Sequence, residues 1–112
     1  TDPLVLRCLV PLYAANVRPN IAMVRTATLE AETTPAVVIL DLVRQVVLES
    51  TVLHILVELD LELTGSGVQM MFTGLPDRAL RTVARTEWWH QVNADGRYYP
   101  DLDAALLAAE RR

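Results

Sequence analysis

A short, continuously apolar run at Val37–Leu40 constrains the fold of this chain more than any other feature. Strands with one solvated face alternate polar and apolar residues, whereas an unbroken apolar run is typical of a strand buried on both faces. The run ends at Asp41, a loop is expected over residues 42–49, and a helix is expected from about Thr51 to Thr64. We therefore expect Val37–Leu40 to lie at the centre of a sheet that helices cover on both sides.

The helix that follows the loop is predicted from its hydrophobic spacing. Its apolar residues recur at intervals of three and four and form one continuous face: Val52, Ile55, Leu56, Leu59 and Leu63. Ser50 and Thr51 precede this face, at a position where hydroxyl groups commonly accept the free backbone N–H groups of the first turn. Helix capping is therefore the first interpretation of these two residues.

Further strands and helices are expected to alternate along the chain. They comprise strands at Leu4–Val10, Val68–Phe72 and Trp88–Val92, an extended piece at Leu12–Ala14, and helices over about 16–31, 76–86 and 100–109. Alternating strands and helices favour parallel pairing through helical crossovers. The pattern predicts an α/β fold with a mixed, mostly parallel central sheet and about four helices. The 112 residues suffice for one hydrophobic core, so we expect residues 1–112 to form a single domain.

Charge, cysteine content and hydropathy argue against several classes of protein. The formal net charge is −4, whereas generic nucleic-acid binders are usually basic. Cys8 is the only cysteine, so an intramolecular disulfide is impossible and a small core thiol is expected. No apolar run approaches the roughly 20 residues of a membrane helix. We expect a domain that is itself soluble, lies in a reducing compartment and binds no nucleic acid.

The sequence lacks the motifs of common catalytic, phosphate-binding and metal-binding sites. It contains no G-x-S-x-G, G-x-G-x-x-G or G-x-x-x-x-G-K-[ST] segment. A metal site needs convergent ligands, and the two histidines, His54 and His90, are far apart in the sequence. We therefore expect no metal, no cofactor and no enzymatic activity.

Two features near residue 80 are candidates for a partner surface. Arg78, Arg81 and Arg85 are spaced by three and four, which places three guanidinium groups on one exposed helix face. This face is either simply solvated, or a surface for phosphates, an acidic partner or anionic lipid headgroups. In an extended segment, Trp88 and Trp89 would point to opposite faces. One ring would fill the core, and the other is either incidentally exposed or an anchor for a partner.

Several segments together resemble a known family. The residues V-V-I-L-D-L at 37–42 and L-E-S-T-V-L-H-I-L at 48–56 resemble the pattern of STAS domains, which are named for sulfate transporters and anti-sigma factor antagonists. T-G-L-P at 73–76 and Y-P-D-L-D-A-A-L at 99–106 resemble the last third of the same family. The resemblance covers about Leu4 to Ala109 and implies an α/β fold of the STAS type.

One segment distinguishes two branches of this family. P-L-Y-A-A-N at Pro11–Asn16 resembles the P-L-[YF]-F-A-N segment of the cytoplasmic STAS domain of SulP-type anion transporters, which stand-alone anti-sigma factor antagonists usually lack. The resemblance implies a non-catalytic regulatory and interaction domain on the cytoplasmic side of the cell membrane. Its implied partners are the transmembrane domain of a parent sulfate or related anion transporter and a cytosolic regulatory protein.

The alternative is a stand-alone anti-sigma factor antagonist switched by phosphorylation at Thr51 or Ser50. The antagonists are phosphorylated on the second hydroxyl of a D-S-[ST]-G segment, and Thr51 matches that position. Glu49 replaces the Asp and Val52 replaces the Gly, and both departures favour the transporter hypothesis. Under either hypothesis, the loop before the helix is a candidate site for a nucleotide or an acidic partner. It contains three charged candidates: Asp41, Arg44 and Glu49.

Overall fold

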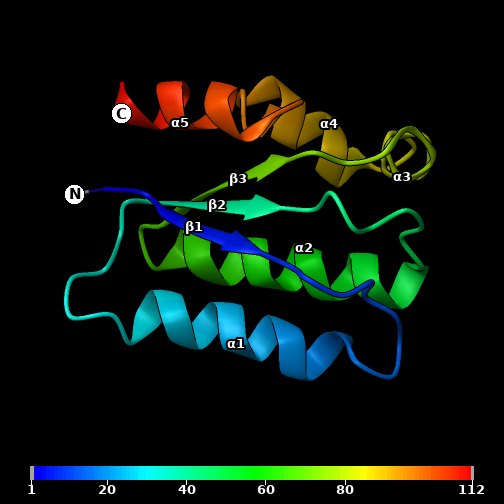
Figure 1. Ribbon diagram of the computed structural model, residues 1–112, viewed down its shortest axis with the longest axis horizontal. Coiled ribbons are helices and arrows are strands. Elements are labelled where there is room, and N and C mark those ends of the chain that lie inside the picture. The colour runs from blue at the N-terminus through cyan, green and yellow to red at the C-terminus, as the bar shows by residue number, and fades with distance from the viewer. Residues whose placement is uncertain (1, 112) are drawn as a thin grey trace.

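The computed structural model describes residues 2–111, which form a four-stranded sheet between layers of helices (Figure 1). In chain order the elements are β1 Leu4–Arg7, α1 Val17–Leu29, β2 Val37–Asp41, α2 Ser50–Gly65, β3 Gln69–Thr73, α3 Asp77–Val83, α4 Glu87–Ala94, β4 Tyr98–Tyr99 and α5 Leu102–Glu110. The sheet has the order β1-β2-β3-β4, and each neighbouring pair of strands is parallel. The predicted α/β class is confirmed.

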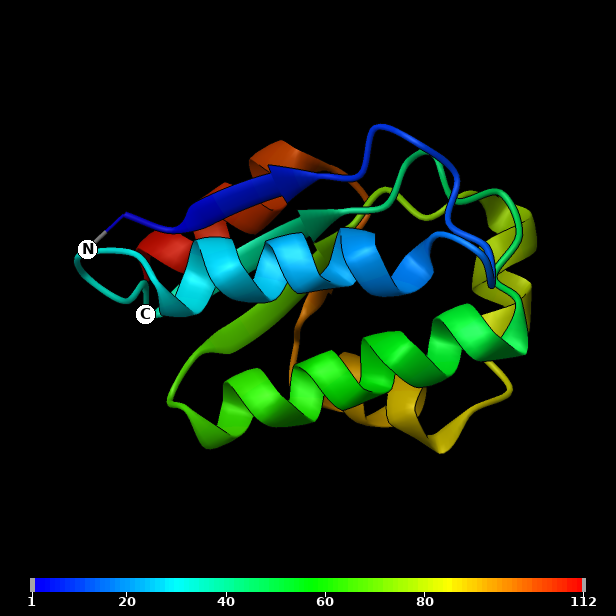
Figure 2. The same ribbon diagram turned by 90° about the horizontal axis from the view of Figure 1, so that it is seen from below.

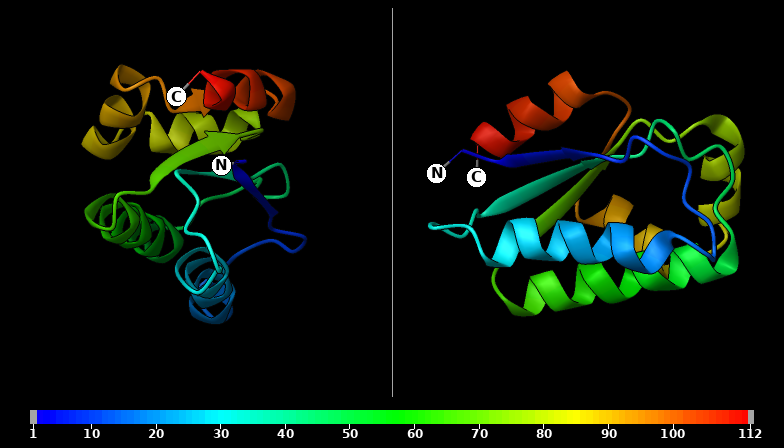
Figure 3. Two further views of the ribbon diagram at one scale, coloured as in Figure 1. Left: turned by 90° about the vertical axis from the view of Figure 1, so that its left-hand side faces the viewer. Right: turned by 60° about the horizontal axis from the view of Figure 1, so that its bottom comes forward.

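Helices cover both faces of the sheet (Figures 2 and 3). On one face, Leu40 and Phe72 pack into the larger hydrophobic core beneath α1 and α2. On the other face, Ile39 and Met71 pack against Ala105 of α5. Strand β2 is consequently buried at each of its five positions, as its unbroken apolar run predicts.

The carboxyl ends of β1, β2 and β3 lie at one end of the molecule, opposite the two chain termini (Figure 1). Three connections meet there: residues 8–16, residues 42–49, and residues 74–86 with helix α3. We call this region the loop end. In parallel α/β sheets, ligands bind preferentially beyond the carboxyl ends of the strands. The loop end is therefore the first place to look for a functional site.

The expected strand at Trp88–Val92 is wrong, because these residues lie in helix α4. The Thr86 hydroxyl caps this helix by accepting a hydrogen bond from the backbone N–H of Trp89 at 3.2 Å. Trp89 and Val92 are three residues apart and both buried, which fits the period of a helix. Aromatic and β-branched residues favour strands, but here the cap and the helical spacing prevail. The protein therefore has five helices among its described residues instead of about four.

The edges of the sheet also differ from the prediction. The fourth strand is β4, which pairs parallel with β3, so the described sheet is parallel throughout and not mixed. Strand β1 ends at Arg7 and not at Val10, and residues 12–14 form no strand. Beyond Arg7 the chain leaves the sheet, and the backbone N–H of Leu12 donates to a side chain instead of a neighbouring strand.

The start of α2 differs from the capping interpretation. Glu49 occupies the N-cap position, and its side chain makes no capping hydrogen bond. Ser50 and Thr51 are the first two residues of the helix itself, so the interpretation of their hydroxyls as caps is wrong. Asn16 likewise occupies the N-cap position of α1 without a side-chain capping bond. By contrast, Asp101 caps α5, accepting from the backbone N–H of Ala104 at 2.8 Å.

Candidate functional site

One polar residue from each strand lies in register across the carboxyl edge of the sheet. The paired residues are Arg7 with Asp41, Asp41 with Thr73, and Thr73 with Tyr99. Asp41 is a residue that the sequence predicts for the site, because an apolar strand ends in it. The other three belong to segments that give no such signal, and only the register of the strands brings them into one row.

Through its carboxylate, Asp41 links the end of β2 to the end of β1 and to the first turn of the following loop. Its side chain is almost fully buried, and Oδ2 accepts a hydrogen bond from Arg7 Nε at 2.9 Å. Its Oδ1 accepts the backbone N–H of Val43 at 3.1 Å, which shapes the first turn of the loop. Gly74 lies so close that a Cβ there would stand 2.9 Å from Oδ1, and its φ of +77° also favours glycine. Asp41 is thus an anchor for the loop end whose carboxylate is already engaged.

Two further groups at this edge are Cys8, which is partly buried, and Thr73, which is fully buried. Burial, and secondarily the negative charge of Asp41, raises the pKa of the Cys8 thiol. A thiol with a raised pKa stays protonated at neutral pH and is a weak nucleophile. Thr73 is buried, and its Oγ1 has no hydrogen-bond partner within residues 2–111. We therefore interpret both side chains as packing residues of this edge and not as nucleophiles.

Gln45 ties together the two loops that extend from β1 and β2. Its side chain is fully buried, Oε1 accepts the backbone N–H of Leu12 at 2.7 Å, and Nε2 donates to the carbonyl of Val10 at 2.9 Å. A polar residue in mid-loop gives no sequence signal for such a role, because the partner atoms are backbone groups more than thirty residues away. The brace fixes residues 8–16 relative to residues 42–49.

The segment Pro11–Asn16 is also closed on itself. The Asn16 side chain accepts the backbone N–H of Tyr13 at 2.8 Å and donates to the carbonyl of Pro11 at 3.0 Å. Leu12 is buried in the larger core, whereas the Tyr13 side chain is exposed. The P-L-Y-A-A-N sequence therefore encodes a preformed loop with one inward anchor and one outward aromatic ring.

The other predicted residues of the β2–α2 region are at the surface. Arg44 and Glu49 are exposed, and neither makes an ion pair within residues 2–111. Ser50 and Thr51 are exposed in the first turn of α2, while Val52 after them is fully buried. The β2–α2 region therefore presents one cation, one anion and two hydroxyls to solvent.

The arginines of the α3 region lie at the same end of the molecule (Figure 1). Arg78 and Arg81 are exposed on α3, and Arg85 is exposed just beyond the end of that helix at Val83. Trp88 is instead half-buried, with its ring at 5.4 Å and edge-on to that of Phe72. The structure therefore brings the three arginines to the loop end and holds Trp88 against the core.

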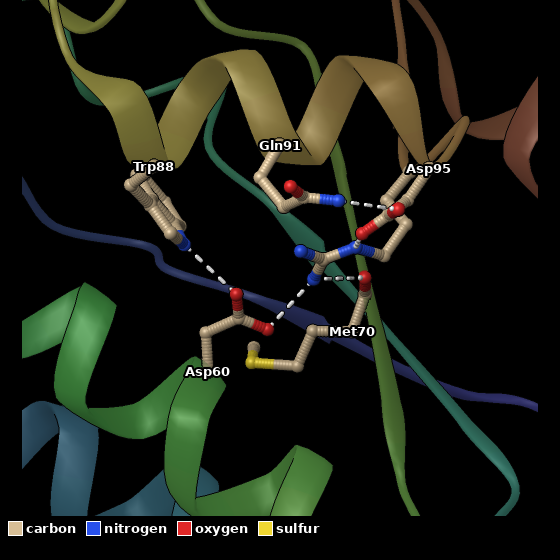
Figure 4. A network of polar contacts seen from close by, with 6 residues as sticks. Asp60, Met70, Trp88, Gln91 and Asp95 are labelled. Atoms are coloured by element: carbon tan, nitrogen blue, oxygen red, sulfur yellow. Dashed lines mark hydrogen bonds and ion pairs between the residues drawn. The ribbon is translucent and has the colours of Figure 1, made fainter.

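A buried polar network holds the Trp88 side chain in its half-buried position (Figure 4). Its indole Nε1 donates to Asp60 Oδ2 at 2.8 Å, and Asp60 Oδ1 accepts from Arg97 Nη1 at 2.7 Å. The Asp60 and Arg97 side chains are 4% and 9% exposed. Arg97 also donates to the carbonyl of Met70 at 3.3 Å and pairs with Asp95 at 3.3 Å. The network joins α2, β3 and α4 through one guanidinium that pairs with two carboxylates, those of Asp60 and Asp95.

The sequence gives only a faint signal for this network. Asp60 lies four residues after Leu56, on the face of α2 that is otherwise apolar, and an acid there needs a buried partner. The partner, Arg97, is 37 positions away in a segment without a recognisable pattern. A cavity of about 460 Å³ borders the network, lined in part by Trp88 and Gln91.

Residues 2–111 contain no group of three or more His, Cys, Asp or Glu side chains that is arranged to hold a metal ion. Within the same residues, no helix has the length and apolar character needed to cross a bilayer.

The sequence was compared with models of protein families and with curated proteins. The family model described as the STAS domain matches residues 1–105. Among curated proteins, no sequence matches the chain significantly.

Several solved structures have a similar fold. A sulfate transporter family protein from Wolinella succinogenes is 23% identical, with a TM-score of 0.74, over 96% of this chain and 84% of that one. A SulP transporter STAS domain from Vibrio cholerae is 19% identical, with a TM-score of 0.77, over 98% and 82%. The murine solute carrier 26 family member A9 anion transporter, in its inward-facing state, is 18% identical, with a TM-score of 0.87. That match covers 99% of this chain and 18% of the transporter chain.

Proposed function

Because the chain belongs to the STAS domain family, we propose that it is the non-catalytic regulatory and interaction domain of a SulP-type anion transporter. The observation that carries this proposal is the loop at Pro11–Asn16. Its sequence resembles the segment typical of transporter STAS domains, and Asn16 closes it with hydrogen bonds to Tyr13 and Pro11. A loop that is held this firmly is suited to recognition, because little conformational entropy is lost on binding.

The structural comparisons support the same branch of the family. The three similar structures described above are a sulfate transporter family protein, a SulP transporter STAS domain and an anion transporter. The chain matches 18% of the length of the murine transporter, so in that protein the fold is one part of a much longer chain. We propose a corresponding arrangement here, with a transmembrane domain as the principal partner and the STAS domain on the cytoplasmic side.

The loop end is the surface that we assign to regulatory contacts. It presents Arg44 and Glu49 from one loop and the arginines of the α3 region, all exposed and without an ion pair among the described residues 2–111. These residues belong to separate connections that the parallel sheet gathers at one edge. A cytosolic regulatory protein or a nucleotide would meet the domain on this surface.

A phosphorylation switch at Thr51 or Ser50 has less support. Both hydroxyls are exposed, but Glu49 and Val52 depart from the segment that antagonists carry around the phosphorylated residue. Val52 is fully buried, so its side chain is part of the core and not of an open helix entry. We therefore regard Ser50 and Thr51 as part of the contact surface.

The coding sequence that precedes residue 1 tests this proposal. We expect it to encode a membrane region with about ten or more apolar spans of roughly 20 residues each. A gene that encodes this domain and no membrane span would overturn the proposal. Stoichiometric phosphate transfer to Thr51 from an ATP-dependent anti-sigma kinase, abolished in Thr51→Ala, would also contradict it.

A further inference from the structure

We propose that the loop end docks onto a membrane surface that carries anionic lipid headgroups. The contact is made by an apolar platform, defined as six exposed residues of the first two loops, together with the arginines of the loop end. The platform consists of Leu9, Val10, Tyr13, Val43, Val46 and Val47. The inference rests on the proposed function, which places the domain beside a bilayer, and adds the lipid surface as a partner.

The platform is an unusual concentration of exposed apolar side chains. Its six residues are between 44% and 70% exposed, and they come from two short loops at one end of the molecule. Single exposed apolar residues are normal on a protein surface, but a group of them gathered at one end of the molecule indicates an interaction site. The Leu9 side chain, at 70%, is the most exposed of the group.

The platform is preformed. Gln45 links the two loops through Leu12 and Val10, and Asp41 holds the start of the second loop through Val43. These hydrogen bonds hold the backbone of both loops in the conformation in which the six apolar side chains are exposed.

The charge around the platform indicates the chemistry of its partner. The loop end, residues 8–16, 42–49 and 74–86, contains four arginines and two acidic residues, a net charge of +2. The whole chain has a net charge of −4, so the remainder carries −6. The loop end of this acidic protein therefore combines arginines with exposed apolar residues. A complementary partner surface would carry negative charge on its outside and apolar groups beneath. The cytoplasmic leaflet of a membrane has this combination.

The geometry lets both groups act together. Figures 1 and 2 show α3 and the loops at 8–16 and 42–49 at the same end of the molecule. Arg44 is exposed in the same loop as Val43 and Val46, so one of the four arginines belongs to a loop of the platform itself. In this arrangement the apolar side chains would enter the headgroup region while Arg44, Arg78, Arg81 and Arg85 meet lipid phosphates.

Co-sedimentation of the 112-residue chain with vesicles tests the proposal. One set of vesicles contains phosphatidylcholine alone, and the other contains a mixture of phosphatidylcholine and phosphatidylglycerol. We expect binding to the mixed vesicles to be at least ten-fold stronger, and to weaken as salt is raised, because each arginine near an anionic surface contributes about a five-fold factor. Free inorganic phosphate, added as a competitor, should not displace the protein if the lipid surface is the ligand.

Matched variants separate the platform from the rest of the surface. The Arg78→Gln/Arg81→Gln/Arg85→Gln variant should bind mixed vesicles at least ten-fold more weakly, and Leu9→Ser/Val46→Ser should also lose binding. The control Leu61→Ser/Leu107→Ser changes two residues that are 67% and 58% exposed but lie outside the loop end. The control Arg111→Gln removes an exposed arginine at the end of α5. Both controls should bind like the unaltered protein, and circular dichroism verifies that each variant is folded.

Three outcomes would overturn the inference. They are equal binding to both kinds of vesicle, equal losses in the platform and control variants, and self-association of the chain that the Leu9→Ser/Val46→Ser variant abolishes. The last would assign the platform to a second copy of the chain. Failure of the proposed function is a separate result, because it is read from the coding sequence and not from vesicles.

Discussion

The ion pair between Asp60 and Arg97 is the most deeply buried charged contact among the residues described. Removing one partner from such a pair leaves the other charge without compensation, whereas an exposed acid can be removed at little cost. We expect Asp60→Ala to lower the free energy of unfolding by about 3–5 kcal/mol in urea denaturation. Glu58→Ala, an exposed change on the same helix, should stay within about 0.5 kcal/mol of the original. Equal effects of the two changes would contradict this account of the network.

The Cys8 thiol gives the stability a pH dependence whose sign follows from the burial of the thiol. Burial raises the pKa of Cys8 above its ordinary value of 9.0, so the folded chain binds this proton more tightly than the unfolded chain. The contribution to stability is complete below that ordinary pKa and is lost as the pH rises through the higher, folded-state pKa. Urea denaturation above pH 9.0 should therefore show a steeper fall for the original protein than for Cys8→Ala.

The titration of Tyr98 does not affect the difference in pH dependence between the original protein and Cys8→Ala. Burial raises its pKa as well, but the tyrosine is present in both proteins and its effect cancels in the difference. Parallel stability curves for the original protein and Cys8→Ala would show that the thiol titrates alike in the folded and unfolded chains.

At the scale of elements, Gln45 decides whether the two loops of the loop end form one surface. Gln45→Ala removes both hydrogen bonds of the brace and leaves the buried backbone N–H of Leu12 and the carbonyl of Val10 without their partner. We expect a loss of about 2–3 kcal/mol and faster hydrogen exchange at the backbone amide of Leu12. Val46→Ala, an exposed change one residue away, should leave that amide unaffected. Unchanged exchange in Gln45→Ala would mean that the loops are held by other contacts.

Helix α2 begins without a side-chain cap, which leaves room for stabilisation. Glu49→Ser places at the N-cap a residue whose hydroxyl can accept a backbone N–H of the first turn, and it should raise stability by about 1 kcal/mol. Glu49→Gln removes the same charge without adding a good cap and serves as the control. If both variants are equally stable, the gain does not come from capping.

The elements also show what the sequence can and cannot predict. The buried strand β2 and the long helix α2 follow from hydrophobic patterns that are local to each segment. The sequence does not predict helix α4, because its aromatic residues favour a strand, and it does not predict β4, because two residues are too few to form a pattern. At the site, the sequence singles out Asp41 and the exposed arginines. The roles of Gln45, Asp60 and Arg97 depend on partners far along the chain, which only the folded structure brings together.

At the scale of the whole molecule, the domain is polarised between its two ends. The chain termini lie at one end (Figure 1), and the loops that carry the apolar platform and the arginines of the α3 region lie at the other. The parallel sheet produces this polarity, because it directs the ends of β1, β2 and β3 and their loops to one edge. A domain of this shape can be joined to other parts of a protein and still present its loop end to a partner.

Anion uptake by the full-length protein tests the central claim most directly. The full-length protein and a version without residues 1–112 would be reconstituted in proteoliposomes, and uptake of labelled sulfate and related anions would be compared. The account predicts uptake by the full-length protein and a clear reduction when the domain is removed, although the membrane region is still inserted. A full-length protein that carries no anion, or uptake that is unchanged without residues 1–112, would contradict it.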